Sequence, residues 1–375
     1  MYLQHLYLKN FRNYLEQEVK FEAQKTIIVG NNAQGKSNLL EAVELLATLK
    51  SHRTSRDRDL VNEGAISGQI DATVERAYGS TDLGLILRKQ GRRTARLNHE
   101  NLRRQMDFLG HLNAVQFSSL DLDLVRGSPE NRRNWLDSLL IQLEPVYAYI
   151  LQQYDRVLRQ RNSLLRKLKK AETKPSPETL TQLALWDAQL AANGSRVTRR
   201  RLRGLHRLAP IAREWHARIS GAKEVLAINY TPNVNCDRDE PEAVQGAFLS
   251  RIRDRAIPER QQGTTLVGPH RDEIELTIDD TPARFYGSQG QQRTLVLALK
   301  LAELELIEEV IGEAPLLLLD DVLAELDPSR QNQLLEAIQD RFQTLITTTH
   351  IQTFDTQWLN ASQVLSVMEG DISIF

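Results

Sequence analysis

The sequence predicts an α/β fold in which a head domain is interrupted by a helical insertion. A short β-branched strand at 26–29 precedes a glycine-rich loop and then a helical pattern at 36–50. A second apolar run, at 316–319, ends in two adjacent acids. Between them, residues 130–218 have helical periodicity and no strand pattern. We therefore expect a mixed β-sheet with flanking helices, interrupted by a helical lid or arm domain.

Composition limits the class of protein. The chain has 375 residues, 48 Lys and Arg against 49 Asp and Glu, and a net charge of −1. It has no long apolar stretch or signal-peptide pattern, and its single Cys236 excludes a disulfide framework and a cysteine-based zinc site. We expect a cytoplasmic protein with no membrane association. Any binding of nucleic acid must come from an uneven distribution of charge within the chain.

Strand and helix patterns divide the chain into three parts. Strands are expected first, at 2–8, 17–22, 26–29, 68–76, 83–88, 93–98 and 114–117. Helices follow, with a break at 174–177 that predicts a hairpin between two of them. Strands and helices then alternate, at 225–230, 273–278, 289–311, 316–319, 328–341 and 344–349. The expected domains are 1–120 (N-terminal part of the head), 121–219 (a basic helical insertion) and 220–375 (C-terminal part of the head).

A phosphate-binding loop is predicted at 30–37, which reads G-N-N-A-Q-G-K-S and matches GxxxxGK[ST]. Backbone N–H groups and the start of the following helix would bind phosphate oxygens. Lys36 would contact the β- and γ-phosphates of ATP, and Ser37 would hold Mg²⁺. The alternative is a glycine-rich turn with an exposed lysine. The expected cofactor-binding residues of this loop are Gly30, Asn31, Asn32, Ala33, Gln34, Gly35, Lys36, Ser37 and Asn38.

A P-loop site needs a carboxylate at the end of a second strand to hold the metal. Four leucines at 316–319 followed by Asp320 and Asp321 meet this need. Asp320 is expected on the metal side. Asp321 is then placed to polarise the water that attacks the γ-phosphate. The alternative interpretation is a strand followed by an acidic turn.

A third motif selects one class of P-loop protein. Ser288, Gly290 and Gln291 fit the S-x-G-Q core of an ABC signature, just before a long helix and about 30 residues before Asp320. In ABC heads this motif contacts the γ-phosphate bound to a partner protomer, so the site is completed only in a head-to-tail dimer. Two further features agree with an ABC-type head: a D-loop at 324–327, and His350 where a γ-phosphate-sensing histidine is expected.

The chain resembles the bacterial RecF family of SMC-like ABC ATPases along its whole length. The strings that carry the resemblance are L-K-N-F-R-N-Y (8–14), K-S-H-R-T-S (50–55), G-S-P-E-N-R-R-N-W-L-D (127–137), Q-R-N-S-L-L (160–165), W-D-A-Q-L (186–190), G-P-H-R-D (268–272), S-Q-G-Q-Q-R-T (288–294) and L-L-L-D-D-V-L-A-E-L-D (317–327).

The resemblance implies a function. RecF-like proteins bind ATP, dimerise on it, and bind double-stranded DNA near single-strand gaps. With RecR and RecO they help RecA load onto gaps, and slow, weak hydrolysis of ATP resets the dimer. Related heads use the arginine of an N-F-R motif at the nucleotide, which implies that role for Arg12.

The sequence departs from the family pattern in three places. The family usually reads F-x-P-E-D-L where this chain has F-S-S-L-D-L at 117–122. The missing acid leaves Gln116 and Asp121 as alternative metal or water contacts. Ala324 replaces the more usual serine of the D-loop, and many RecF-like chains lack a histidine at the position of His350.

Basic residues are concentrated in the helical insertion, while 301–313 is acidic. We expect the insertion to contact DNA phosphates without reading sequence. For any single arginine, a solvated helix face paired with acids is the simpler interpretation. His52 and Arg53 are compatible with contacts to either DNA or nucleotide. The candidate DNA contacts are Arg159, Arg161, Arg199, Arg200 and Arg201.

Four rival functions share parts of these motifs. An ABC transporter subunit would lack the long basic insertion, and a structural SMC tether would need a far longer coiled coil. An ABC-linked nuclease would need an additional acidic metal cluster. A purely DNA-binding module would not need the two adjacent acids.

Overall fold

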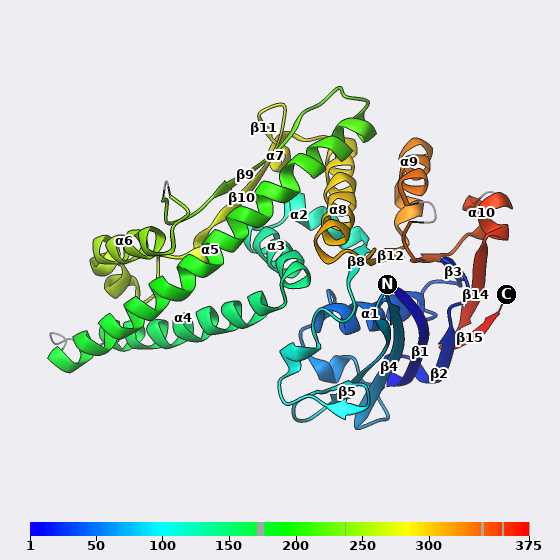
Figure 1. The fold of residues 1–375 in the computed structure, drawn as a ribbon, viewed down its shortest axis with the longest axis horizontal. Coiled ribbons are helices and arrows are strands. Elements are labelled where there is room, and N and C mark those ends of the chain that lie inside the picture. Colours follow the sequence, from blue (N-terminus) through cyan, green and yellow to red (C-terminus); the bar gives the residue numbers. More distant parts are fainter. Residues whose placement is uncertain (171–175, 237, 339–340, 355, 375) are drawn as a thin grey trace. The chain divides into compact units, whose positions relative to one another are not determined.

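The chain divides into two compact units. The computed structural model describes residues 1–170, 176–236, 238–338, 341–354 and 356–374 (Figure 1). One unit comprises Met1–Leu122, Ile211–Glu224 and Gln289–Phe375, and the other comprises Asp123–Pro210 and Val225–Ser288. This division differs from the predicted one, in which the head resumed at residue 220. Residues 225–288 instead cluster with the insertion.

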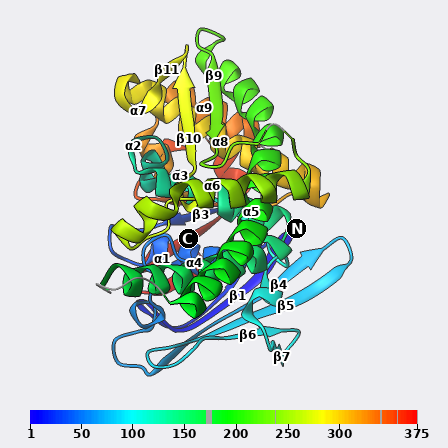
Figure 2. The same cartoon turned by 90° about the vertical axis from the view of Figure 1, so that its left-hand side faces the viewer.

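The first unit contains an antiparallel sheet of six strands in the order β2-β1-β4-β5-β6-β7 (Figure 2). A register shift between Leu3 and His5 lets Leu3 and Leu6 both face the core, although their spacing is odd. The strands are β1 (Tyr2–Phe11), β2 (Tyr14–Lys20), β4 (Ser67–Arg76), β5 (Gly79–Arg88), β6 (Thr94–Leu97) and β7 (Glu100–Asn101).

A second six-stranded sheet in the same unit has the order β15-β14-β3-β13-β12-β8. Five of its strands are parallel, and β15 pairs antiparallel with β14. The carboxyl ends of parallel strands share one edge of a sheet, so the loops after β3, β8, β12 and β13 lie together. The strands are β3 (Lys25–Val29), β8 (Ala114–Phe117), β12 (Leu316–Asp320), β13 (Thr344–Thr348), β14 (Ser362–Met368) and β15 (Asp371–Ile374).

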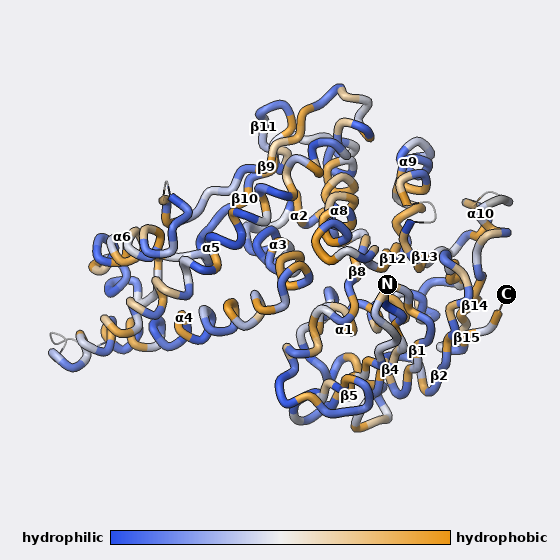
Figure 3. Tube along the Cα trace, in the orientation of Figure 1, coloured by the Kyte–Doolittle hydropathy of each residue, from blue (hydrophilic) through white to orange (hydrophobic). Residues whose placement is uncertain are grey.

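One hydrophobic core joins both sheets to α1 (Lys36–Thr48). Leu39, Leu40 and Val43 of α1 are buried among the apolar faces of the two sheets, so the helix that follows the phosphate loop is held from both sides. The largely apolar α8 is visible in Figure 3. The other described helices of this unit include α8 (Gln289–Ile311), α9 (Pro328–Ile338) and α10 (Thr356–Asn360).

The second unit is mainly helical, with a small sheet of order β11-β10-β9. Leu164, Leu165 and Leu183 form a separate apolar cluster between its two longest helices. The expected hairpin at 174–177 lies largely outside the described residues. The elements are α2 (Asp123–Arg126), α3 (Pro129–Leu143), α4 (Val146–Lys170), α5 (Pro177–Ser220, which continues into the first unit), β9 (Leu226–Thr231), α6 (Pro241–Gln262), β10 (Glu273–Ile278), β11 (Thr281–Pro282) and α7 (Ala283–Tyr286).

Within the described residues, no helix has the length and apolar character needed to span a membrane.

Candidate functional site

The loop at 30–35 connects β3 to α1 at the carboxyl edge of the parallel sheet. Gly35 has φ +123°, and Ala33 also has a positive φ of 64°. The φ of Gly35 favours glycine, and a Cβ there would also lie 2.7 Å from the Asn13 side chain, which would have to move. The buried Lys36 donates from Nζ to the carbonyls of Gly30 (2.8 Å) and Asn31 (3.0 Å). The loop therefore lies between a strand and a helix, the context in which phosphate-binding loops occur.

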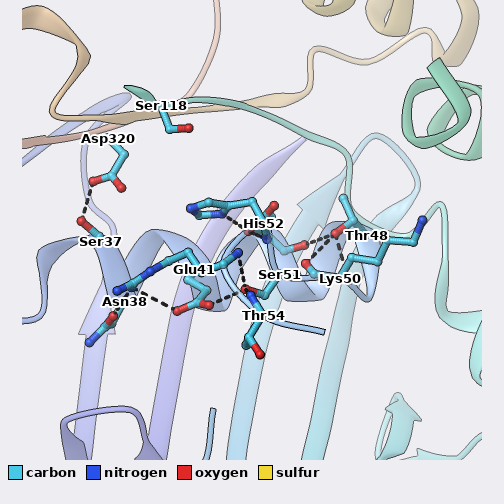
Figure 4. A network of polar contacts seen from close by, with 12 residues as sticks. Ser37, Asn38, Glu41, Thr48, Lys50, Ser51, His52, Thr54, Ser118 and Asp320 are labelled. Carbon is cyan, nitrogen blue, oxygen red and sulfur yellow. Dashed lines mark hydrogen bonds and ion pairs between the residues drawn. The ribbon is translucent and has the colours of Figure 1, made fainter. Parts of the chain in front are cut away.

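Ser37 and Asp320 meet across the sheet edge, as Figure 4 shows. The Ser37 hydroxyl donates to Oδ1 of Asp320 at 2.8 Å, and the Thr347 hydroxyl reaches the same oxygen at 2.8 Å. Pairing of β13 with both β3 and β12 brings these residues together. A hydroxyl and a carboxylate oxygen are hard ligands of the kind that Mg²⁺ prefers, usually alongside phosphate oxygens. The residues present therefore fit the expected magnesium ion.

Asp321 follows directly and adopts φ +54°. Its backbone N–H donates to the Thr347 hydroxyl at 2.9 Å. Burial raises the pKa of the Asp321 carboxyl, Lys36 opposes this shift, and the charge of Asp320 adds to it. A carboxylate whose pKa is raised is a better proton acceptor when ionised, which suits the role predicted for it.

The two alternatives for the missing acid differ in their contacts. Asp121 pairs with Lys300 at 3.1 Å and accepts the Ser118 backbone N–H at 2.6 Å. Burial lowers the pKa of Lys300, but Asp121 and Glu303 outweigh this effect and raise it. Gln116 lies beside Leu318 of β12, and its buried amide nitrogen and oxygen make no hydrogen bond. Asp121 is thus committed to an ion pair, whereas the Gln116 amide is not.

Arg12 reaches α1. It has φ +54°, and its guanidinium donates to both oxygens of the buried Glu41, at 2.9 and 2.6 Å, and to the Asp59 carbonyl at 2.8 Å. Its neighbour Asn13 was not among the predicted residues. Asn13 donates to the carbonyl of Gln34 and accepts from Asn38, each at 2.7 Å. The only signal for it was its place in the string L-K-N-F-R-N-Y.

The segment 50–55 packs on the same helix (Figure 4). Ser51 donates to Glu41 at 2.5 Å, and Arg53 donates to the Asn38 side chain at 2.7 Å. His52 Nδ1 lies 2.6 Å from Glu44. Burial lowers the pKa of His52, but the hydrogen bond and charge of Glu44 outweigh burial and raise it. These contacts place the segment beside the first turns of the phosphate-loop helix.

The signature residues span the point in the sequence where the second unit ends and the first unit resumes. Ser288 is the last residue of the second unit, and Gly290 and Gln291 lie in the first turn of α8 in the first unit. The Gln291 amide donates to Glu224 at 3.0 Å, and Arg330 donates to the Gly290 carbonyl at 3.2 Å. Their expected partner is the nucleotide of a second protomer.

The remaining predicted head residues lie beyond β12 and β13. Ala324 is exposed in a short 3₁₀ turn, Val322–Glu325. Oδ1 of Asp327 accepts the backbone N–H groups of Ser329 and Arg330 at the start of α9, and these bonds lower the pKa of its carboxyl. His350 is exposed just after β13, where its backbone exchanges hydrogen bonds with the Thr348 hydroxyl.

The predicted DNA contacts are corrected in part. Arg161 is buried and pairs with Asp187 (2.7 Å) and Glu259 (2.6 Å). Arg201 is buried and pairs with Asp137 (2.8 Å) and Asp272 (3.3 Å). Neither side chain is accessible to a DNA phosphate, so both assignments were wrong.

The other three candidates are at the surface to different degrees. Arg199 pairs with Asp239 at 2.6 Å, and Arg200 pairs with Glu144 at 3.0 Å. Both arginines already have acidic partners, as the simpler interpretation of the cluster expected. Arg159 is exposed on α4.

Comparisons with known proteins identify the family. Residues 2–372 match the RecF/RecN/SMC N terminal domain. The chain is 69% identical over 384 residues, covering 100% of both chains, to the DNA replication and repair protein RecF of Gloeothece citriformis (strain PCC 7424). It is also 69% identical to that of Nostoc punctiforme (strain ATCC 29133 / PCC 73102), over 99% of each chain.

Solved structures agree with this assignment. A structure of the recombination mediator protein RecF with ATP, in the RecFOR pathway, has a TM-score of 0.91 at 32% identity and covers 100% of this chain and 97% of that one. An Smc head domain from Pyrococcus furiosus, with a TM-score of 0.56 at 17% identity over 100% of this chain and 96% of that one, shares the fold. The chain therefore belongs to the RecF family of DNA replication and repair proteins and has the fold of SMC/RecF-type ATPases.

Proposed function

We propose that this protein is an ATP-dependent DNA clamp that acts in recombinational repair at single-strand gaps. The observation that carries the proposal is the 2.8 Å contact between Ser37 and Asp320 at the end of a correctly folded phosphate loop. Two oxygen groups so close, beside the Lys36 ammonium, form a site for a metal–nucleoside triphosphate. The ATP-bound RecF relative supports the same ligand.

Ser37 and Asp320 would hold Mg²⁺, which would neutralise negative charge on the phosphates. Lys36 exchanges its carbonyl partners for phosphate oxygens, and the N–H groups at the start of α1 bind the remaining ones. Gln116 presents a buried amide that a water or metal-bound ligand would satisfy. Arg12, in the β1–β2 turn and held by Glu41 of α1, would contact the nucleotide phosphates.

Asp321 accepts a proton from the attacking water, and His350 contacts the γ-phosphate. Ser288, Gly290 and Gln291 of a second protomer complete the site, so that two ATP molecules join a head-to-tail dimer. Hydrolysis removes the shared γ-phosphate contacts and opens the dimer. The nucleotide can drive this change only through its greater affinity for the closed state.

The closed dimer binds double-stranded DNA near gaps through the basic helical unit, where Arg159 is an exposed cation. DNA accelerates a weak ATPase activity. With RecR and RecO the clamp promotes loading of RecA. The RecFOR pathway named for the structural relative supports these partners.

Light scattering of the pure protein, with and without ATP–Mg²⁺ and then with gapped DNA, tests the proposal. The expected result is an ATP-dependent shift from monomer to dimer that DNA strengthens. The control variant is Lys36→Ala, which should remain monomeric because it lacks the phosphate-binding ammonium. A wild-type protein that binds ATP yet stays monomeric would contradict the self-sufficient clamp.

A further inference from the structure

Two strings that the nucleotide site does not use meet in the second unit. G-S-P-E-N-R-R begins α3, and G-P-H-R-D forms the loop before β10. Arg133 of the first string donates to the carbonyl of Asp272 in the second at 2.8 Å. Arg201 of α5 binds the same loop, donating to the Pro269 carbonyl at 2.6 Å. Two carbonyls of the loop thus accept hydrogen bonds from arginines of two helices.

The carboxylates around this loop are already engaged. Asp272 accepts from Arg201, from the Tyr230 hydroxyl and from the Asn233 backbone N–H. Asp137 is bound on both oxygens by Arg201. Glu273 accepts two bonds from Arg132, at 3.0 and 2.9 Å.

Two arginines near the loop, Arg133 and Arg271, are not ion-paired with these acids. In the part of the chain that the structure describes, neither makes an ion pair: Arg133 has its bond to the Asp272 carbonyl, and Arg271 has one to the Thr265 carbonyl at 3.5 Å. Burial lowers the pKa of Arg133 and the charge of Arg201 lowers it further, whereas the charges of Asp272, Glu130 and Glu273 act in the opposite direction. A guanidinium that loses water without a carboxylate as a direct partner is unfavourable, and a bound anion would reduce this cost.

His270 lies among these arginines and is itself neutral. Its Nε2 donates to the Thr265 carbonyl at 3.1 Å, so Nδ1 accepts the Tyr154 hydroxyl at 2.6 Å. Burial lowers the pKa of His270 to about 4, and Arg271, Arg133 and Arg201 contribute to the shift. The positive charge at this position therefore belongs to the two unpaired arginines.

We propose that Arg133 and Arg271 form a phosphate-binding site whose occupant is a backbone phosphate of double-stranded DNA. Planar guanidinium groups match phosphate oxygens. Arg271 is exposed and Arg133 is half-buried, so the site opens at the surface, where a phosphate within a polymer can enter. The DNA assignment rests on the proposed function. The site also supplies phosphate contacts that Arg161 and Arg201 cannot make, because both are buried.

The first experiment measures the affinity of the full chain for a DNA duplex as a function of salt. Arg133→Gln and Arg271→Gln should each reduce the slope of log K against log salt by about 0.9, the value for one lost phosphate contact. Arg133→Lys keeps the charge and should restore most of the slope. Arg255→Gln, at an exposed position of α6, controls for the loss of one positive charge. Unchanged slopes for both site variants would overturn the DNA assignment.

The second experiment titrates inorganic phosphate while NMR follows the ring of His270. A phosphate bound beside the ring should raise the pKa of His270, and the double variant of Arg133 and Arg271 should abolish the rise. A wild-type protein that fails to bind DNA would contradict the proposed function. The phosphate titration would still show whether Arg133 and Arg271 bind a phosphate. A response to phosphate with unchanged DNA slopes would assign the site to free phosphate instead, and no response would overturn it.

Discussion

Asp320 and Asp321 are adjacent in sequence but differ in environment. Asp320 is held by the hydroxyls of Ser37 and Thr347, whereas no side chain donates to the carboxylate of Asp321 among the contacts that the structure describes. Replacing Asp321 by Asn should reduce ATP turnover by about 100-fold or more, the usual contribution of a general base. ATP binding should persist. Single-turnover kinetics and nucleotide titration check both, and wild-type turnover would contradict the assignment.

The pKa of Asp321 also predicts a pH dependence. Burial raises this pKa above the ordinary value for Asp. In the proposed role of Asp321 the ionised form accepts the proton, so turnover should fall as pH decreases through the raised pKa and should be constant above it. The acidic limb of a kcat–pH profile measures this, provided that circular dichroism shows the fold intact. If turnover instead falls at the ordinary pKa of Asp, burial does not control the pH dependence.

Arg199 and Arg201 are two residues apart and should differ strongly in their effect on stability. Arg201→Gln leaves Asp137 and Asp272 buried without their cation, a loss of about 3–5 kcal/mol in the free energy of unfolding. Arg199→Gln removes a more exposed ion pair and should cost at most about 1 kcal/mol. Urea unfolding measures both. Equal effects would contradict the buried network.

This contrast shows what sequence patterns leave open at the scale of a residue. The three consecutive arginines at 199–201 cannot be distinguished by sequence pattern. Acids that are remote in sequence determine which of the three is buried. The partners of Arg201 lie 64 and 71 positions away. Residue type and spacing contain no information about such pairings.

Several elements were predicted with the bounds that the structure has. The expected strands at 114–117 and 273–278 and the expected helix at 289–311 coincide with β8, β10 and α8. A short apolar run at 114–117, an alternating run at 273–278 and a long run of helix-forming residues at 289–311 make these easy to recognise. The helix α6 was missed. Pro241 at its start and Gly263 in the left-handed conformation at its end were the available signals, but Pro258 interrupts the pattern.

Replacing glycine by alanine should have opposite effects on stability at two positions, Gly35 and Gly246. Gly35→Ala forces a Cβ onto Asn13 at φ +123° and should abolish ATP binding while destabilising the fold by about 1–3 kcal/mol. Gly246→Ala, in α6, meets nothing within 4 Å and should stabilise by about 0.5–1 kcal/mol. Thermal unfolding and nucleotide titration of both variants check this. Retained ATP affinity in Gly35→Ala would contradict the required loop conformation.

At the scale of the whole molecule, the proposed trans arrangement of the ATP site makes a sharp prediction. Lys36→Ala and Ser288→Arg should each prevent ATP-dependent dimerisation when pure. Mixed together, they should form a heterodimer, because the phosphate loop of one variant and the signature of the other build one intact site. Light scattering with one differently tagged variant measures this. A mixture that stays monomeric would support a signature that acts within its own chain.

The division of the chain into units was the least predictable feature. Residues 225–288 were assigned to the head because strand patterns return there. In the structure their contacts are with the helical insertion: Glu259 with Arg161, and Glu273 with Arg132. Local periodicity identifies a strand but not the unit to which it belongs.

The position of β3 has a consequence for the order in which the protein folds during synthesis. The strand that leads into the phosphate loop pairs with β13 and β14, which lie near the end of the chain. At roughly 5–20 residues per second, the ribosome needs tens of seconds to supply these partners. The antiparallel sheet can assemble long before that. A nascent chain therefore carries its nucleotide motif early but acquires the ability to bind nucleotide among its last steps.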